Sequence, residues 1–375
     1  MRSHVFLTGA TGFIGSGILQ KWLTDEPEAE IAVLVRTRRG VDPQTRLRRL
    51  LPEIFPSSEA GASEVEISRA EAFPQRVSIV EGDISLDRFG LTDSAYGDLA
   101  ARTTHIIHCA AAVRFDLPLE EARAINVAGS ENVVALGRRC AGLRRIDYVG
   151  TAYVAGRRTG TVKESELDLG QEHNNTYERT KLESELLMRK AMKDLPITIY
   201  RPSIVICDSR TGRISRYSAI FRMLKAYDIG QLPALPGSPS TLLDLVPMDY
   251  VADLLHAIAS RTESLGSCFH LTAGSENLTS LALVAGLASE HFGRPRFQIV
   301  PPEVFEAAIR KREAGLSEAE RDLLEEIGIY RPYLAGDLRF DNSNVRALLG
   351  TSYEAPPPLA SYFARMSDYI RQTAD

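Results

Sequence analysis

A glycine-rich turn near the start of the chain sets the strongest limit on its fold. Residues 5–17 read VFLTGATGFIGSG, and glycine recurs at every third position, at Gly9, Gly12 and Gly15. An apolar run precedes the turn, a helical pattern follows it, and a second apolar run occupies 31–35, so the segment predicts a strand–helix–strand unit. Glycine here permits a tight turn, close approach of backbone N–H groups to a phosphate, and close packing of helix on strand.

The turn predicts a dinucleotide-binding site, because the N-terminus of the following helix directs partial positive charge toward a bound pyrophosphate. A glycine triplet alone also occurs in ordinary loops, and the strand before it and the helix after it favour the nucleotide site. We expect these residues of the turn to contact the cofactor: Gly9, Thr11, Gly12, Phe13, Ile14 and Gly15.

Composition narrows the class of protein. The 375 residues are 44% hydrophobic and 25% charged, which is typical of a globular chain with one large domain or two modest ones. The formal net charge of −5 argues against nucleic acid or an anionic membrane as a partner, since both require a basic face. The apolar runs fall short of the roughly 20 residues that span a bilayer, so we expect no transmembrane segment.

The cysteines and the start of the sequence bear on location. Cys109, Cys140, Cys207 and Cys268 show no CxxC spacing, so they predict neither a metal site nor a redox pair. The first strand begins almost at the first residue, which leaves no room for a signal peptide before it. These features together predict a cytoplasmic protein in a reducing compartment.

Apolar runs alternate with helical patterns through the first part of the chain. They predict a doubly wound α/β fold, a parallel Rossmann sheet buried on both faces, with the ligand at the carboxyl ends of the strands. The runs are VFLTG, IAVLV, VSIVE, HIIHCA, IDYVG and ITIYR, and Cys268–Leu271 is a further candidate.

The remainder predicts a smaller, mostly helical C-terminal substrate lobe. We expect residues 1–206 to form the nucleotide-binding domain, with 245–272 returning to it. Residues 207–244, rich in proline, and 273–375, rich in helical patterns, are then the substrate-binding flap and lobe. Apolar residues of this lobe either line an acyl channel or form an ordinary core: Val304, Phe305, Ile309, Leu316, Leu323 and Leu324.

The end of the second strand indicates which nicotinamide cofactor binds. Sites for NAD place Asp or Glu there, whereas this chain has Arg36 and, further on, Arg46. A guanidinium binds the 2′-phosphate of NADPH with charge-assisted hydrogen bonds. The pattern therefore favours NADPH, and the alternative is a solvated basic loop.

Other residues at strand ends are candidates for cofactor contacts. Asp83 and Ile84 follow the third strand, where they either contact the adenine or end the strand with Asp as a helix cap. Ala110 and Ala111 follow the fourth strand, and their small side chains let the backbone approach the cofactor. His108 beside them is better explained as a hydrogen-bonded buried residue than as a base.

Two further positions complete this set. Asn126 lies within the next helix, where asparagine is unfavourable, so it has either a functional role or a satisfied polar contact. After the sixth strand, Pro202 is expected to stiffen the loop that borders the nicotinamide, with Ile204 packing near it.

Three residues form a candidate catalytic group. Thr151 ends the fifth strand, and Tyr177 and Lys181 lie four residues apart, on one face of a predicted helix. A phenol titrates near pH 10, so a neighbouring cation is needed for it to exchange protons readily at neutral pH. Lys181 can supply that charge and bind the nicotinamide ribose, while Thr151 can hydrogen-bond the substrate oxygen.

These motifs together resemble the extended short-chain dehydrogenase/reductase superfamily, and most closely its fatty acyl-CoA reductase and thioester-reductase branch. The resemblance covers about residues 4–260 and rests on TGATGFIG, LVR, HCAAAVRF, TAYV, YERTK and RPSIV. It implies reduction of an acyl thioester, on coenzyme A or an acyl carrier protein, by NADPH to an aldehyde and in some members onward to the alcohol.

The catalytic group leaves other functions open. A ketone or alcohol dehydrogenase, or a nucleotide-sugar epimerase or dehydratase, would use the same three residues. A sensor that binds NADP(H) without catalysis would need neither Tyr177 nor Lys181. Neither the acyl chain nor the oligomeric state follows from these residues.

Overall fold

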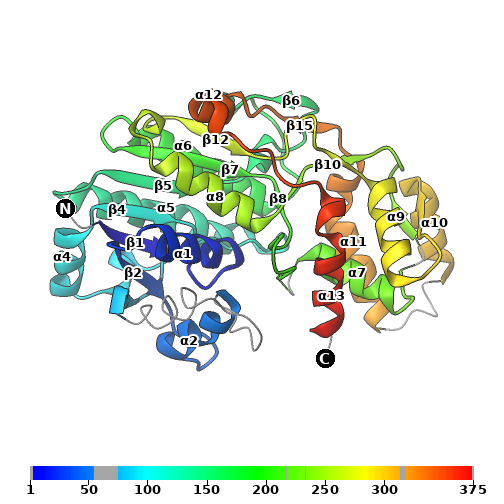
Figure 1. Cartoon of the computed structure of the whole chain (residues 1–375), viewed down its shortest axis with the longest axis horizontal. Coiled ribbons are helices and arrows are strands. Elements are labelled where there is room, and N and C mark those ends of the chain that lie inside the picture. Colours follow the sequence, from blue (N-terminus) through cyan, green and yellow to red (C-terminus); the bar gives the residue numbers. More distant parts are fainter. Residues whose placement is uncertain (1–2, 55–74, 216–217, 233, 313–317, 374–375) are drawn as a thin grey trace.

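The computed structural model describes residues 3–54, 75–215, 218–232, 234–312 and 318–373. It consists of a parallel sheet covered by helices on both faces and a smaller, largely helical lobe beside it (Figure 1). The C-terminus lies on the lobe and the N-terminus on the sheet domain (Figure 1). No helix in this described part is long and apolar enough to cross a bilayer.

The central sheet has seven strands, and every pairing between them is parallel. Their order across the sheet is β3-β2-β1-β4-β5-β7-β12. This confirms the predicted doubly wound sheet, and its central strands are buried on both faces, whereas the edge strand β3 is partly exposed. The strands are β1 (His4–Thr8), β2 (Glu30–Val35), β3 (Val77–Glu81), β4 (His105–His108), β5 (Arg145–Val149), β7 (Ile197–Pro202) and β12 (Cys268–Leu271).

Helices on the two faces of the sheet bury separate cores. Helices α1 (Phe13–Asp25), α2 (Pro43–Ile54) and α8 (Met248–Ala259) cover one face. Helices α4 (Asp93–Arg102), α5 (Leu119–Arg139) and α6 (Thr176–Ala191) cover the other. Alternation along β1 serves both cores, since Val5 and Leu7 belong to the first and Phe6 to the second.

The strand order reverses beside β1, which has β2 on one side and β4 on the other. In open sheets of this kind the crevice at the carboxyl ends of the strands, at the point of reversal, is where ligands bind. The ends of β1 and β4 therefore place the glycine turn and the segment after His108 at the expected binding edge.

The lobe has a core of its own. It contains α7 (Ala219–Asp228), α9 (Leu281–Phe292), α10 (Pro302–Arg312), α11 (Glu318–Ala335) and α13 (Phe363–Gln372), with β9 (Ala234–Pro236) paired to β14 (Gln298–Val300). Phe305, Leu323 and Leu324 pack against this core, Val304 is 51% exposed, and Leu316 lies outside the described residues. Phe305, Leu323 and Leu324 therefore serve the lobe's packing.

Short segments link the lobe to the sheet domain. Strand β8 (Ile204–Val205) pairs with β11 (Leu245–Val246), and β10 (Leu242–Leu243) pairs with β13 (Thr279–Ser280). Strand β15 (Leu338–Phe340) pairs with β6 (Gly160–Val162) of the sheet domain.

Helix α12 (Ser343–Leu349) departs from the predicted division, which assigned all of 273–375 to the lobe. Its apolar residues Val345 and Leu349 join the core of the sheet domain next to α8 and β12. The chain thus leaves the lobe, covers the sheet and returns, which no local pattern in this segment indicates.

Candidate active site

The glycine turn has the geometry that its sequence predicts. Gly9 has a φ of 81°, and a Cβ on it would lie 2.6 Å from the backbone nitrogen of Ala110. A Cβ on Gly15 would lie 2.0 Å from the carbonyl oxygen of Gly9. The first glycine is required by both conformation and contact with the β4 end, and the second by the approach of α1 to the turn.

The N-terminus of α1 is open to an anion. Gly12 is the residue before the helix and provides no side-chain cap, and the first turn contains no acidic residue. The backbone N–H groups of Phe13, Ile14 and Gly15 have no partner within an α-helix that begins here. Such a helix terminus attracts phosphate, so the turn fits the pyrophosphate of a dinucleotide.

Basic side chains gather beside this turn. Arg46 donates hydrogen bonds to Thr11 Oγ1 at 3.0 Å and to the carbonyl oxygen of Arg36 at 2.6 Å. Burial, together with the charges of Arg38 and Arg36, lowers the pKa of Arg46 from its ordinary value. Cations held this close concentrate positive potential where an anionic ligand would relieve it.

Asp83 lies at the same edge, after β3. Its Oδ2 accepts a 2.9 Å bond from Arg36, while Oδ1 accepts from the backbone and hydroxyl of Ser85. Burial opposes ionisation, but these hydrogen bonds outweigh it and keep the pKa of Asp83 below its ordinary value. The next residue, Ile84, packs against α5, where a Cβ on Gly129 would lie 2.8 Å from Ile84 Cγ1.

The segment after β4 connects the glycine turn to the candidate catalytic residues. The backbone of Cys109 lies against Gly9, where an added Cβ would come within 2.7 Å of its carbonyl carbon. The Cys109 thiol interacts electrostatically with Lys181 and with Tyr177. Burial raises the pKa of this thiol to about 12, so it stays protonated. Ala110 and Ala111 follow directly, half-buried along the same edge.

Thr151, Tyr177 and Lys181 lie near the carboxyl end of β5, and their catalytic role stays a prediction. The Thr151 hydroxyl hydrogen-bonds the Tyr177 phenol and also accepts from Tyr153 N at 3.2 Å, capping the short 3₁₀ helix η2 (Ala152–Ala155). Lys181 Nζ donates to the carbonyl oxygen of Val149 at 2.8 Å, at the carboxyl end of β5. The three groups therefore lie at the binding edge of the sheet.

Burial shifts the pKa values of the two titrating groups in opposite directions. It raises the pKa of Tyr177 to about 12, against the hydrogen bond from Thr151. It lowers the pKa of Lys181 to about 8, and the negative charge of Glu185 opposes this shift only in part. The phenol accordingly holds its proton at neutral pH. The ammonium is mostly charged at neutral pH, because that pH lies about one unit below its pKa.

His108 and Asn126 have structural partners. His108 Nδ1 lies 2.8 Å from Thr8 Oγ1 and Nε2 lies 3.3 Å from Ser130 Oγ, and burial lowers the pKa of His108 to about 3. This supports a neutral, hydrogen-bonded histidine. Asn126 accepts from Ala112 N at 2.8 Å and donates to Thr180 Oγ1 at 2.9 Å, so it fastens the segment after β4 to α6.

Pro202 and Ile204 lie where the sixth predicted strand ends. Pro202 is the last residue of β7, paired with Leu271 of β12, and is buried. Ile204 is half-buried in β8. Their contacts with a nicotinamide, like those of the other cofactor residues, stay predictions.

An aromatic cluster beside Tyr177 could not be identified from local motifs. Phe115 stacks on Tyr177 with ring centres 5.6 Å apart, and on its other sides it meets Tyr330 and Tyr333 at 5.2 and 5.7 Å. Tyr153 meets Tyr333 edge-on at 4.9 Å. The end of helix α11 thus packs on Phe115, the ring that stacks on the candidate catalytic phenol.

Hydrogen bonds hold α11 in this position. Tyr333 donates to Glu178 Oε1 at 2.5 Å and accepts from Asn175 Nδ2 at 2.8 Å. Asn175 caps α6 by accepting from Glu178 N at 2.9 Å, and Glu178 accepts from Asn174 N at 2.8 Å. The same residues therefore begin α6 and hold the lobe against it, and the local signal for them is the asparagine cap before YERTK.

This sheet, glycine turn and Thr-Tyr-Lys arrangement define an extended short-chain dehydrogenase/reductase with a nicotinamide-cofactor site. The chain belongs to the NAD-binding family described as "Male sterility protein", whose model matches residues 7–255. That confirms the predicted resemblance.

Individual relatives agree with the family. The chain is 25% identical to "Fatty acyl-CoA reductase wat" of Drosophila melanogaster over an alignment of 404 positions, which covers 92% of this chain and 77% of that protein. A crystal structure of the terminal R domain from the myxalamid PKS-NRPS biosynthetic pathway matches with a TM-score of 0.83 and 25% identity, covering 99% and 91% of the two chains. UDP-glucuronic acid 4-epimerase from Bacillus cereus, with a TM-score of 0.67, 19% identity and 98% and 99% coverage, shares the fold alone.

Proposed function

We propose that this protein is an NADPH-dependent reductase of acyl thioesters, borne by coenzyme A or an acyl carrier protein. The product is an aldehyde, and a second reduction would give the alcohol. The observation that carries the proposal is the hydrogen-bonded pair of Thr151 and Tyr177, with Lys181 beside it, joined to the glycine turn through Cys109. The reductases among the relatives support the same reaction.

Several residues would hold the cofactor. The open N-terminus of α1 suits the pyrophosphate. Arg36 and Arg46 suit a 2′-phosphate, because the end of β2 carries arginine where an NAD site would carry a carboxylate. Lys181 would bind the ribose hydroxyls. Each of the four cysteines is a free thiol, which supports the predicted cytoplasmic location.

Bound NADPH supplies a hydride to the thioester carbonyl carbon. Tyr177 retains its proton because its pKa lies near 12, so its Oη can donate that proton to the carbonyl oxygen as negative charge develops there. The Thr151 hydroxyl can donate a second hydrogen bond to the same oxygen. The Lys181 ammonium adds positive potential and favours the phenolate that Tyr177 leaves behind.

These steps give a thiohemiacetal, which then breaks its C–S bond. The oxygen loses its proton and re-forms the carbonyl, and the sulfur leaves with the bonding electrons and takes up a proton. The phenolate of Tyr177 is the nearest base for the hydroxyl proton. One thioester, one NADPH and one proton thus yield one aldehyde, one thiol and one NADP⁺.

Turnover with a panel of thioesters tests the proposal. The purified protein should oxidise NADPH with acyl-CoA or acyl-carrier-protein substrates, and mass spectrometry should detect the aldehyde. One NADPH consumed per thiol released indicates aldehyde, and two indicate alcohol. Absence of turnover across chain lengths and both carriers, with NADPH still bound, would overturn the proposal.

The same panel separates the alternatives. A ketone or alcohol dehydrogenase would act on carbonyl compounds without releasing thiol, and an epimerase would interconvert nucleotide sugars without net consumption of NADPH. A non-catalytic sensor would bind NADPH, and no product would depend on Tyr177. Arginine at the end of β2 makes an NAD-dependent epimerase the less favoured of these.

A further inference from the structure

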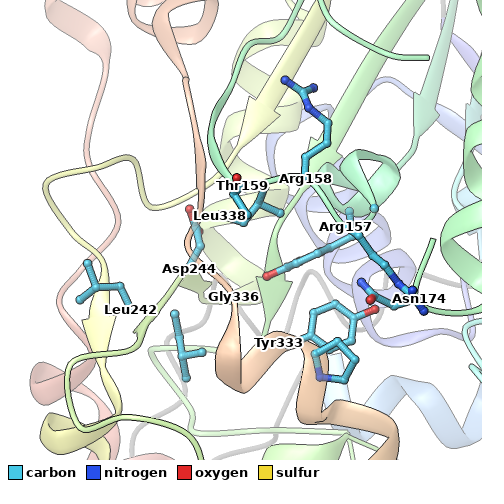
Figure 2. Close-up of a pocket in the computed structure, with 13 residues that line it drawn as sticks. Arg157, Arg158, Thr159, Asn174, Leu242, Asp244, Tyr333, Gly336 and Leu338 are labelled. Atoms are coloured by element: carbon cyan, nitrogen blue, oxygen red, sulfur yellow. The ribbon is translucent and has the colours of Figure 1, made fainter. Parts of the chain in front are cut away.

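A cavity of about 250 Å³ lies between the sheet domain and the lobe (Figure 2). Four parts of the chain line it: the segment from η2 to β6, Asn174 just before α6, the segment from β10 to β11, and the segment from the end of α11 to β15. This is the volume that about eight water molecules occupy in the liquid, so the cavity suits one polar group or a short portion of a larger substrate.

Asp244 is the unusual member of its lining. Its side chain is 3% exposed, and its Oδ1 accepts from Ser203 Oγ at 2.5 Å and from Ala273 N at 2.8 Å. Its Oδ2 is buried and has no hydrogen-bond partner among the described residues. A buried polar atom left without a partner is costly, and Asp244 lines the cavity, so a ligand there that brings a hydrogen-bond donor would complete the carboxylate.

Asp244 is the charged group of the cavity lining that has no oppositely charged partner among the described residues. The two arginines of the lining already have acidic partners, Arg157 with Glu172 at 3.0 Å and Arg158 with Glu166 at 2.8 Å. Burial raises the pKa of Asp244 to about 6, which still leaves it mostly ionised at neutral pH. The cavity therefore favours a hydrogen-bond donor over an anion.

The cavity adjoins the candidate catalytic group. Tyr153, which lines the cavity, lies two residues after Thr151 and interacts with the charge of Asp244. Tyr333, also in the lining, meets Phe115, and Phe115 stacks on Tyr177. A substrate held with its carbonyl at Tyr177 could reach the cavity past these rings.

We propose that this cavity is a subsite for the thioester substrate, in which Asp244 Oδ2 accepts a hydrogen bond from an O–H or N–H group. This inference rests on the proposed reductase function. The donor belongs either to the acyl chain, as a hydroxyl or amino group, or to the amide-bearing pantetheine arm. A site built to hydrogen-bond a substrate group discriminates strongly against substrates that lack it.

Replacement Asp244→Asn tests the subsite. The new carbonyl oxygen can still accept from Ser203 and Ala273, while the amide places a donor where the carboxylate had an acceptor. The substrates form a matrix: an acyl chain with or without a distal hydroxyl, each as a coenzyme A thioester and as a simple S-ethyl thioester without amides.

Two patterns support the subsite and identify the donor. A loss of about tenfold to a hundredfold in kcat/KM confined to both hydroxylated substrates places the donor on the acyl chain. The same loss confined to both coenzyme A thioesters places it on the pantetheine arm. Equal effects on all four substrates, or no effect on any, overturn the subsite.

Controls separate this result from folding and from the proposed function. Asp337→Asn removes the same charge from a 72% exposed carboxylate beside the cavity and should leave all four rates unchanged. Leu242→Trp should narrow the cavity from its rim and reproduce the pattern if Asp244→Asn does not fold. If the wild-type protein reduces none of the thioesters, the proposed function fails. Binding of non-reducible thioether versions of the four compounds then still tests Asp244, since a binding loss in the variant without the predicted donor dependence would reject the subsite.

Discussion

The candidate active site has a cofactor side made of residues close together in the sequence and a substrate side made of residues far apart in it. On the cofactor side, Gly9, Gly15 and Arg46 come from one strand–helix–strand unit and its next helix, and backbone contacts fix their identity. On the substrate side, Tyr333 of α11 bonds to Glu178, 155 residues earlier, and side-chain packing sets the arrangement. The cofactor side tolerates few residue types, whereas the substrate side can change composition while keeping its shape.

This difference has a consequence for substitutions. A change on the cofactor side either meets backbone, as at Gly9 and Gly15, and should distort the turn, or removes a contact to phosphate and should weaken cofactor binding. A change on the substrate side alters packing that other side chains share, so it should affect substrate and stability modestly. Tyr177 lies between the two sides, because it hydrogen-bonds Thr151 and stacks on Phe115, and Phe115 in turn meets Tyr330 and Tyr333 of the lobe.

The largest expected effect is that of Tyr177→Phe. Loss of the phenolic proton should lower kcat about a hundredfold to ten-thousandfold, the usual contribution of a positioned acid. The ring and its stacking on Phe115 remain, so the Kd for NADPH, measured by fluorescence titration, should change little. Retained turnover would show that the two sides meet at another residue.

Arg46→Ala should have the next largest effect, and the effect should be confined to cofactor binding. Removal of a guanidinium from the 2′-phosphate should raise the Kd for NADPH about tenfold to a hundredfold and leave that for NADH nearly unchanged. Arg48→Ala, an exposed residue of the same helix, serves as the control. Equal losses for both cofactors would mean that Arg46 acts through Thr11 and the turn rather than through the phosphate.

Much of the cofactor side could be predicted because backbone geometry restricts its residues. Only glycine fits where Gly9 and Gly15 approach other backbone atoms, so the spacing of the glycines in the sequence predicts the conformation of the turn. The seven strands were equally recognisable, since burial on both faces requires continuous apolar runs. The spacing of Tyr177 and Lys181 is fixed by one helical turn.

The substrate side could not be predicted in the same way. Phe115, Tyr153 and Tyr333 look like ordinary aromatic residues, and only the docking of α11 brings them together. Asp244 sits in a proline-rich stretch with no motif, and its unpartnered oxygen is visible only after β11 and β12 are in place. Helix α12 shows the same limit, because its return to the sheet depends on contacts far away in sequence.

The dependence of kcat on pH tests whether the charge of Lys181 contributes to catalysis. Its pKa of about 8 means that the ammonium is charged below that pH and loses its proton above it. With saturating NADPH and thioester, kcat should therefore be level at lower pH and fall about fivefold from pH 8 to pH 9. A profile that stays level to pH 10 would mean that bound cofactor holds the ammonium charged.

The smallest expected effect is that of Tyr333→Phe, which keeps the ring and removes the hydroxyl that bonds Glu178 and Asn175. The free energy of unfolding should fall by about 1 kcal/mol, and the thioester KM should rise a few fold because α11 is held less firmly over Tyr177. Tyr227→Phe is the matched control, since its buried hydroxyl donates to carbonyls of Arg294 and Pro295 within the lobe. It should cost similar stability, measured by urea denaturation, without raising KM. If both variants raise KM equally, the lobe acts as one unit and the docking bonds of Tyr333 have no separate part in placing substrate.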